Sequence, residues 1–168
     1  MNSTLVLCLG NDVLSDDAFG YHLAQRLQDR EEFAGKADIQ FAPLAGFNLL
    51  PLLQNRRRLL IVDTIVTGRA LPGTMHFYPM GEATPSRQLT SSHQISLPHA
   101  LALGRALGMT VPEHVDVLAV EAEDVYTLSE EMTPPVEEAL EPALCRVAEW
   151  IAAEVMEDYH GRLEIQAG

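Results

Sequence analysis

The chain has 168 residues, which predicts one domain, and 47% of them are hydrophobic, enough for a sizeable core. Acidic residues outnumber lysine and arginine by 24 to 11, so the net charge is −13. This balance argues against a nucleic-acid or anionic-membrane surface, because such surfaces are normally basic. The basic cluster Arg56, Arg57 and Arg58 is expected to be solvated surface.

Two cysteines are too few for a disulfide framework. Cys8 lies in an apolar run and Cys145 on a helical pattern, so we expect two buried thiols in a reducing compartment. The N-terminus lacks the basic region of a signal peptide, and no apolar run approaches the roughly 20 residues that span a bilayer. We therefore expect a cytoplasmic protein with neither membrane nor nucleic-acid partners.

Strand-like and helix-like segments alternate along the chain. The nearly continuous apolar runs 4–10 and 59–63 are typical of strands that are covered on both faces. The expected strands are 4–10, 37–42, 59–63, 73–78 and 115–120. The expected helices are 18–27, 46–53, 99–107 with Pro98 in its first turn, and one that starts at Pro134 after the N-cap Thr133 and is kinked at Pro142.

This alternation predicts a three-layer α/β/α fold, in which helices flank a mostly parallel, twisted five-stranded sheet. We expect residues 1–158 to form this single domain and residues 159–168 to form a flexible C-terminal tail. Reactive groups in such folds gather beyond the carboxyl ends of the strands. The loop after the first strand and the end of the third strand should therefore open onto the same edge.

Three acidic residues at these two positions are candidates for a site. The loop from Gly10 to Gly20 contains Asp16 and Asp17, but it lacks a dinucleotide or Walker motif, and its carboxylates would repel a phosphate. Helix capping accounts well for one of these acids and poorly for the other, and the pattern alone slightly favours capping. Asp63 directly follows a buried strand, and no turn is due there, so a role in a site is favoured over a turn.

His93 lies in a small polar segment before the expected helix. The alternative is a capping box of Ser91 and Gln94, but Pro98 would then lie inside the helix, which weakens that interpretation. His99 is a rival that we expect in the core or on the surface.

Two carboxylates and one imidazole can bind a divalent cation and leave coordination positions open. The set lacks the ligands of a structural zinc site. The same groups could instead act as acid and base on a bound water. We expect them to meet around one shared cavity.

These residues resemble the nickel–iron hydrogenase maturation endopeptidases. The opening signature of that family is similar to Leu9-Gly10-Asn11 followed by the segment LSDDAFG at 14–20. Asp63 in IVDT and His93 in SHQ match the second and third site positions of the family. The segment 119–134 resembles its C-terminal half, and the similarity extends over about residues 4–155.

The resemblance implies that Asp17, Asp63 and His93 are the metal-recognising and catalytic residues. It implies an endopeptidase that removes the C-terminal extension of a hydrogenase large-subunit precursor after nickel insertion. The nickel would be carried by the substrate, and the enzyme would hold no metal or cofactor of its own. Aspartic-type and metal-assisted chemistry both stay open, and Asp16 is expected to cap and orient the helix.

The chain departs from the family pattern at two places. Ala18 stands where many relatives have glycine, and Phe41-Ala42-Pro43 replaces a loop similar to Asp-Gly-Gly. That loop is implied to contact the substrate, so the hydrogenase that is processed stays open. The alternative functions are a non-catalytic, chaperone-like protein that checks the precursor for nickel, and a nucleotide-binding domain, which the acidic loop disfavours.

Overall fold

The computed structural model describes the backbone of residues 2–80 and 92–166, and the side chains of residues 2–80 and 97–153. Five strands form one sheet in the order β2-β1-β3-β5-β4. Strands β2, β1, β3 and β5 are parallel, and β4 pairs with β5 in the antiparallel sense. The strands are β1 (Thr4–Leu9), β2 (Asp38–Ala42), β3 (Arg58–Ile65), β4 (Met75–Pro79) and β5 (His114–Glu121).

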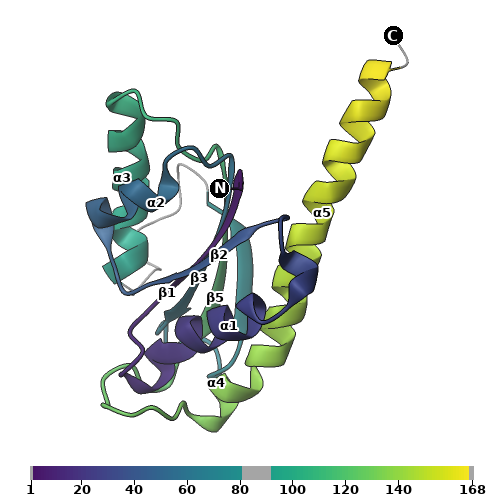
Figure 1. The fold of residues 1–168 in the computed structure, drawn as a ribbon. Helices are drawn as coiled ribbons and strands as arrows, with labels where there is room; N and C mark the ends of the chain where they lie inside the picture. The colour runs from purple at the N-terminus through teal and green to yellow at the C-terminus, as the bar shows by residue number, and fades with distance from the viewer. Residues whose placement is uncertain (1, 81–91, 167–168) are drawn as a thin grey trace.

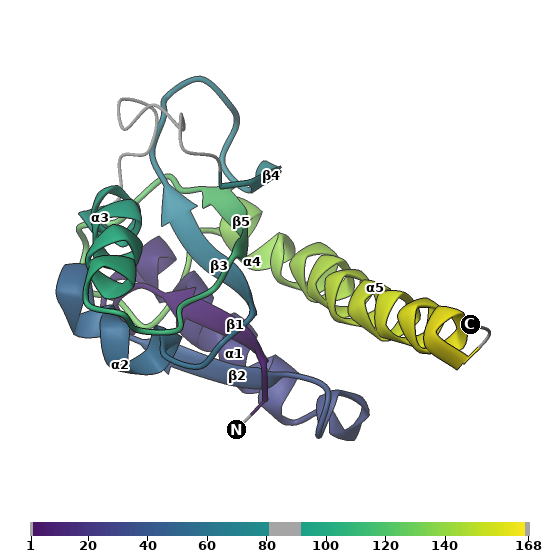
Figure 2. The same cartoon turned by 90° about the horizontal axis from the view of Figure 1, so that it is seen from above.

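Helices cover both faces of the sheet, with α1 and α5 on one side and α2 and α3 on the other (Figures 1 and 2). The helices are α1 (Phe19–Gln28), α2 (Leu50–Leu53), α3 (Ser92–Ala106), α4 (Pro134–Glu138) and α5 (Leu140–Gln166), with short 3₁₀ helices at Ser15–Ala18, Glu31–Phe33 and Gly46–Leu49. The C-terminal part of α5 extends beyond the sheet (Figure 1). The three-layer, mostly parallel fold is therefore confirmed.

Strand β1 shows why the sheet needs helices on both sides. Successive side chains of a strand point to opposite faces. Val6 and Cys8 pack in the core on the side of α1 and α5, whereas Leu5, Leu7 and Leu9 pack on the side of α2 and α3. All of these side chains are fully buried, which explains the continuous apolar run in the sequence.

Strand β3 is longer than the sequence predicted. It continues through Asp63 to Ile65, which pairs with Glu121 at the end of β5. Asp63 therefore lies inside the strand instead of directly after it. The strand continues because its neighbour β5 also continues, and a local apolar run does not contain that information.

Helix α3 begins earlier than predicted and contains Pro98 in its interior. The expectation that Pro98 marks the first turn was wrong. An interior proline removes one helical hydrogen bond at a cost of about 3 kcal/mol, but this cost can be offset by packing. Leu97 and Leu101, which flank Pro98, are both buried in the core on this side of the sheet.

Pro142 predicted an interruption of the last helix, and the structure shows one. The break falls at Ala139, between α4 and α5. A proline ring clashes with the carbonyl four residues earlier, which here belongs to Glu138, the last residue of α4. Helix α5 then continues to Gln166, and the flexibility of residues 159–168 stays a prediction.

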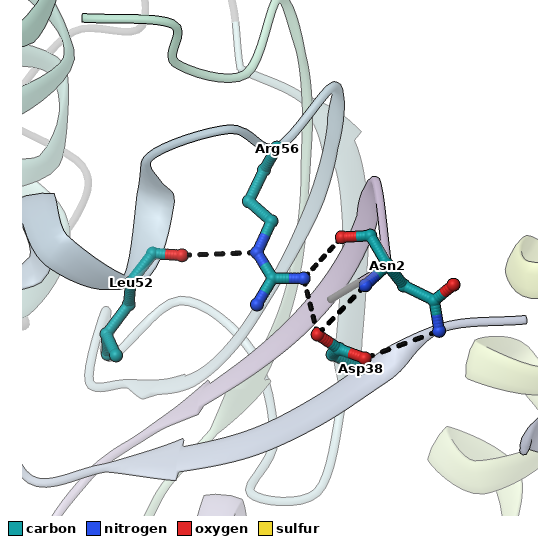
Figure 3. Close-up of polar contacts among 4 residues, drawn as sticks. All are labelled: Asn2, Asp38, Leu52 and Arg56. Carbon is teal, nitrogen blue, oxygen red and sulfur yellow. Dashed lines mark hydrogen bonds and ion pairs between the residues drawn. The ribbon is translucent and has the colours of Figure 1, made fainter. Parts of the chain in front are cut away.

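The sequence analysis expected the basic cluster to be solvated surface, which is correct for the exposed Arg57 and wrong for Arg56. Arg56 is 1% exposed, and its Nη1 donates to the carbonyl of Asn2 and, over 2.5 Å, to Oδ2 of Asp38 (Figure 3). Its Nε donates to the carbonyl of Leu52. Burial alone would raise the pKa of Asp38, but hydrogen bonds from Arg56 and Asn2 and the Arg56 charge bring it below its usual value. The guanidinium thus joins the starts of β1 and β2 at the edge where the parallel strands begin.

The expectation of two buried thiols is correct for Cys8 and wrong for Cys145. Cys8 is fully buried in β1, whereas Cys145 is exposed on α5. The helical period fixes which residues share a face, but position 145 lies beside that face and is not covered by the sheet. Among the helices of the described residues, none is long and apolar enough to cross a membrane.

Candidate active site

The carboxyl ends of β1, β3 and β5 lie at one edge of the sheet, because these three strands are parallel. The turn from Gly10 to Asp17 leaves β1 there. Asp63 and Thr64 lie near the end of β3, and Glu121 ends β5. This edge therefore collects the acidic residues that the sequence analysis singled out, together with one that it did not assign.

Two glycines allow the turn after β1 to close tightly. Gly10 has a φ of +137°, and a Cβ placed on it would lie 2.1 Å from the carbonyl oxygen of Asp17. The same carbonyl accepts the N–H of Asn11 over 3.1 Å. A Cβ on Gly20, in α1, would lie 2.1 Å from the carbonyl oxygen of Leu9. Both glycines are thus required for α1 to lie close against β1 and to bring Asp17 to the edge.

Asp17 is half-buried, and its carboxylate is tied to β3. The hydroxyl of Thr64 donates to Oδ1 of Asp17 over 3.0 Å. Thr64 is 2% exposed, so this hydrogen bond is largely shielded from solvent. The contact joins the turn after β1 to the neighbouring strand.

Asp63 is fully buried, and its Oδ1 accepts the backbone N–H of Thr64 over 2.9 Å. Thr64 therefore donates to both carboxylates, through its N–H to Asp63 and through its hydroxyl to Asp17. Two of the three residues that the sequence predicted thus each accept a hydrogen bond from Thr64 at this end of the sheet. One carboxylate is enclosed, whereas the other remains partly open to solvent.

The charge of Asp63 affects two neighbouring acids. Burial and the Asp63 carboxylate raise the pKa of the Cys8 thiol to about 12. Burial and Asp63 also raise the pKa of the Tyr78 phenol to about 12. Both neighbours therefore stay neutral well above physiological pH, so they add no negative charge beside Asp63.

His93 lies in the first turn of α3, and its side chain lies outside the described residues. Helix α3 packs on the face of the sheet that carries Ile61 and Ile65. Asp63 lies between these two residues in β3, so it shares that face. His99, the rival, is an exposed residue of α3. That His93 joins the two carboxylates stays a prediction.

Asp16 is not the helix cap that the sequence suggested. No side chain caps the 3₁₀ helix Ser15–Ala18 or α1. Asp16 is fully buried, and its Oδ2 accepts the N–H groups of Glu123 and Asp124 over 2.8 and 2.9 Å. Its Oδ1 accepts the N–H of Thr133 over 2.7 Å. Asp16 therefore fastens the loop between β5 and α4 to the turn that carries Asp17.

Glu121 is a buried acid at this edge whose contacts the sequence analysis did not foresee. It is 2% exposed, and its Oε1 accepts the N–H groups of Thr67 and Gly68 over 2.7 and 3.0 Å. The Thr67 hydroxyl also contacts both carboxylate oxygens. The sequence feature that could have pointed to Glu121 is its position at the end of an apolar strand, next to the end of β3. These hydrogen bonds hold the segment that follows Asp63 in the chain.

The arrangement suits chemistry at a carbonyl or at a metal ion. Two carboxylates in different environments can divide the work of proton transfer, or they can bind one divalent cation together. Among the described residues, no three histidine, cysteine, aspartate or glutamate side chains form a metal-binding group. The two carboxylates would therefore need a third group from elsewhere.

Known proteins share this sequence pattern and fold. The family model described as hydrogenase maturation protease matches residues 21–150, which include Asp63 and His93. The hydrogenase 2 maturation protease of Escherichia coli K12 is 38% identical over 71 residues, which are 42% of this chain and 43% of that relative's length. The match thus spans less than half of that relative.

Two solved structures extend the similarity over most of the chain. The hydrogenase maturating endopeptidase HybD from E. coli is 30% identical, with a TM-score of 0.75 over 90% of this chain and 93% of its own. The nickel–iron hydrogenase maturation protease HybD from Thermococcus kodakarensis, at 21% identity, shares the fold, with a TM-score of 0.70 over 89% of this chain and 98% of its own. The chain therefore belongs to the hydrogenase maturation protease family.

Proposed function

We propose that this chain is an endopeptidase that removes the C-terminal extension of a nickel–iron hydrogenase large-subunit precursor after nickel insertion. Membership of the hydrogenase maturation protease family supports this function. The observation that carries it is the pair of hydrogen bonds from Thr64, which holds the carboxylates of Asp17 and Asp63 at one edge of the sheet. Both are residues for which the sequence resemblance implies metal recognition and catalysis.

In this proposal the nickel belongs to the substrate. The precursor presents its nickel to Asp17, Asp63 and His93, and the scissile peptide bond is thereby held beside these groups. Fixing the reacting groups in place lowers the barrier, because the entropy of bringing them together has already been lost on binding. A precursor without nickel lacks this anchor and is left intact.

The hydrolytic step then requires one water molecule. Its oxygen adds to the scissile carbonyl, the C–N bond breaks, and a proton passes to the leaving amine. Asp17 is suited to accept and return that proton, because it is partly open to solvent and is oriented by the Thr64 hydroxyl. Asp63 is suited to hold the metal side of the site, because it is enclosed and fixed by the Thr64 N–H.

The test is single replacement of the three groups: Asp17→Asn, Asp63→Asn and His93→Ala. Each variant is incubated with nickel-loaded precursor, and the loss of the extension is followed by mass spectrometry. We expect processing to fall at least about 100-fold in Asp17→Asn, which removes the group that transfers the proton. Asp63→Asn and His93→Ala should each lower it about 10- to 100-fold, through weaker contact with the metal. Asp29→Asn, an exposed acid at the end of α1, is the matched control.

Two further measurements complete the experiment. Thermal unfolding of each variant separates a lost group from a lost fold. Binding of the precursor, measured without cleavage, separates an endopeptidase from a chaperone-like nickel-checking protein. Full processing by all three variants, or binding by the wild type with no shortening of the precursor, would contradict the proposal.

We also place the reaction in the cytoplasm. Both cysteines are free thiols, one of them exposed, which is the usual state in a reducing compartment.

A further inference from the structure

Two loops at the carboxyl edge of the sheet pair with each other and form one continuous surface. They are the turn 11–17 and the loop 122–133, which we call the paired-loop surface. Leu14 forms a β-bridge with Leu128, and the N–H of Ser129 donates to the carbonyl of Val13 over 3.2 Å. The buried Asp16 joins the same two segments from beneath. The pairing leaves both loops little freedom to rearrange.

This surface holds three large apolar side chains in solvent. Val13 is 50% exposed, Leu128 is 78% exposed and Tyr126 is 86% exposed. The turn below Tyr126 is fixed by Asp124, whose Oδ1 accepts the N–H groups of Tyr126 and Thr127. Because hydrogen bonds hold the backbone of both loops, the loops do not fold over these apolar groups. The apolar groups are therefore available for burial against another molecule, which is the usual meaning of such a patch.

The polar residues of the same surface have one sign of charge. The exposed side chains of Asp12, Glu123, Glu130 and Glu131 belong to these two segments, which contain no lysine, arginine or histidine. Carboxylates without cationic neighbours favour a positively charged partner and repel an acidic one. The chain as a whole, at −13, adds to that preference.

We propose that the paired-loop surface docks an extended segment of the hydrogenase precursor in which apolar side chains are interspersed with lysine or arginine. This inference rests on the proposed function, because the precursor is the macromolecule that must reach this edge. Asp17 belongs to the same turn, so a segment held on Val13, Tyr126 and Leu128 is anchored beside the candidate site. The surface would thus add affinity at a distance from the reacting bond.

The experiment measures binding of purified nickel-loaded precursor to the full chain and, separately, its cleavage. The first variant is Tyr126→Ser with Leu128→Ser, and the second is Glu130→Gln with Glu131→Gln. The apolar control is Leu107→Ser, and the charge control is Glu113→Gln. Leu107 is 65% exposed, Glu113 is also exposed, and both lie at the opposite edge of the sheet. Thermal unfolding of all four checks that each is folded.

We expect the apolar variant to bind about tenfold more weakly or worse, as is usual for central contacts of an interface. The loss should appear in KM. The charge variant should bind more weakly at low salt, and its difference from the wild type should shrink at high salt. A synthetic peptide of alternating leucine and lysine should compete with the precursor, and one with glutamate in place of lysine should not.

The outcomes separate this inference from the proposed function. Normal binding by the apolar variant, an equal loss in Leu107→Ser, or equal competition by both peptides overturns the docking surface, even if the wild type cleaves the precursor. Binding that depends on Tyr126 and Leu128, with no cleavage by the wild type, supports the docking surface and contradicts the protease. A wild type that does not bind the precursor overturns both.

Discussion

Asp16 and Thr133 are 117 positions apart in the chain, and they are joined through one carboxylate. The backbone N–H of Thr133 donates to Oδ1 of Asp16 over 2.7 Å, and the Thr133 hydroxyl lies 2.9 and 3.0 Å from the two oxygens. Thr133 also lies at the N-cap position of α4 but caps it with no side-chain hydrogen bond. Its hydroxyl instead completes the coordination of the buried carboxylate.

The first prediction concerns this buried carboxylate. Asp16→Asn replaces one acceptor oxygen by an NH₂ group. That NH₂ group must face at least one of the backbone N–H donors of Glu123, Asp124 or Thr133. An unpaired buried donor costs about 1–3 kcal/mol, so the free energy of unfolding should fall by about 2–3 kcal/mol. Urea unfolding measures the change. Asp12→Asn, an exposed acid of the same turn, should stay within about 0.5 kcal/mol of the wild type. Equal stability of the two variants would refute the structural role of Asp16.

The second prediction concerns the turn after β1. Gly10→Ala should lower the free energy of unfolding by about 3 kcal/mol or more, because its Cβ overlaps the Asp17 carbonyl oxygen at 2.1 Å. Gly35→Ala is the matched control, since Gly35 also has a positive φ, +76°, but has no atom within 4 Å of the added Cβ. It should cost only about 1 kcal/mol, the conformational part alone. The difference between the two variants, measured by urea unfolding, reports the steric overlap together with the difference in backbone strain between φ +137° and φ +76°.

The overlap at Gly10 has a consequence for activity. Relief of the clash must move the backbone of Asp17, so Gly10→Ala should also slow precursor processing under conditions in which the variant is still folded. Normal processing by a folded Gly10→Ala variant would show that the position of Asp17 does not matter.

The third prediction concerns Glu121. Glu121→Ala leaves the N–H groups of Thr67 and Gly68 without their acceptor, and should cost about 2–3 kcal/mol. Glu121→Gln keeps the Oε1 acceptor and should cost about 1 kcal/mol. The released segment contains the exposed Arg69. Trypsin should therefore cleave after Arg69 faster in Glu121→Ala than in the control Glu123→Ala, and equal rates would argue against the clamp.

The fourth prediction concerns alkaline pH. The pKa of the Cys8 thiol is near 9 in the unfolded chain and about 12 in the folded protein, because of burial and the Asp63 charge. Between these values the unfolded chain has released a proton that the folded protein still holds. Stability from this group is therefore complete below pH 9 and declines as pH rises toward 12, by about 4 kcal/mol in total.

Urea unfolding as a function of pH measures this decline, with Cys8→Ala as the matched variant. Without the thiol, the free energy of unfolding should decrease less steeply with pH above pH 9. This holds whatever the replacement does to stability at neutral pH. An unchanged slope in Cys8→Ala would show that the thiol does not carry the effect.

Several features could be predicted from the sequence because they depend on local pattern. The continuous apolar runs of β1 and β3 predicted strands covered on both faces, and they are. Pro142 predicted an interruption of the last helix, and the break falls near the carbonyl with which its ring would clash. Asp17 and Asp63 were expected at one edge, because parallel strands place their carboxyl ends together, and Thr64 joins them there.

Other features could not be predicted, because they depend on partners distant in the chain. The three arginines at 56–58 have one local pattern, yet Arg56 is buried against Asn2 and Asp38 (Figure 3). Its neighbour Arg57 is exposed. Asp16 and Asp17 are likewise adjacent, and their different environments appear only in the fold. The start of α3 was misplaced because a proline was taken as a boundary that packing can override.

The sequence by itself determined the succession of strands and helices along the chain, the burial of both faces of the sheet and the edge at which the acidic residues lie. These follow from hydrophobic periodicity and from the direction of parallel strands, which are properties of short segments. Only the tertiary structure decided that Asp16 is buried among backbone N–H groups, whereas the adjacent Asp17 is partly open to solvent. That division depends on which backbone N–H groups lie within reach of each carboxylate, and those groups come from segments more than 100 positions away in the case of Asp16.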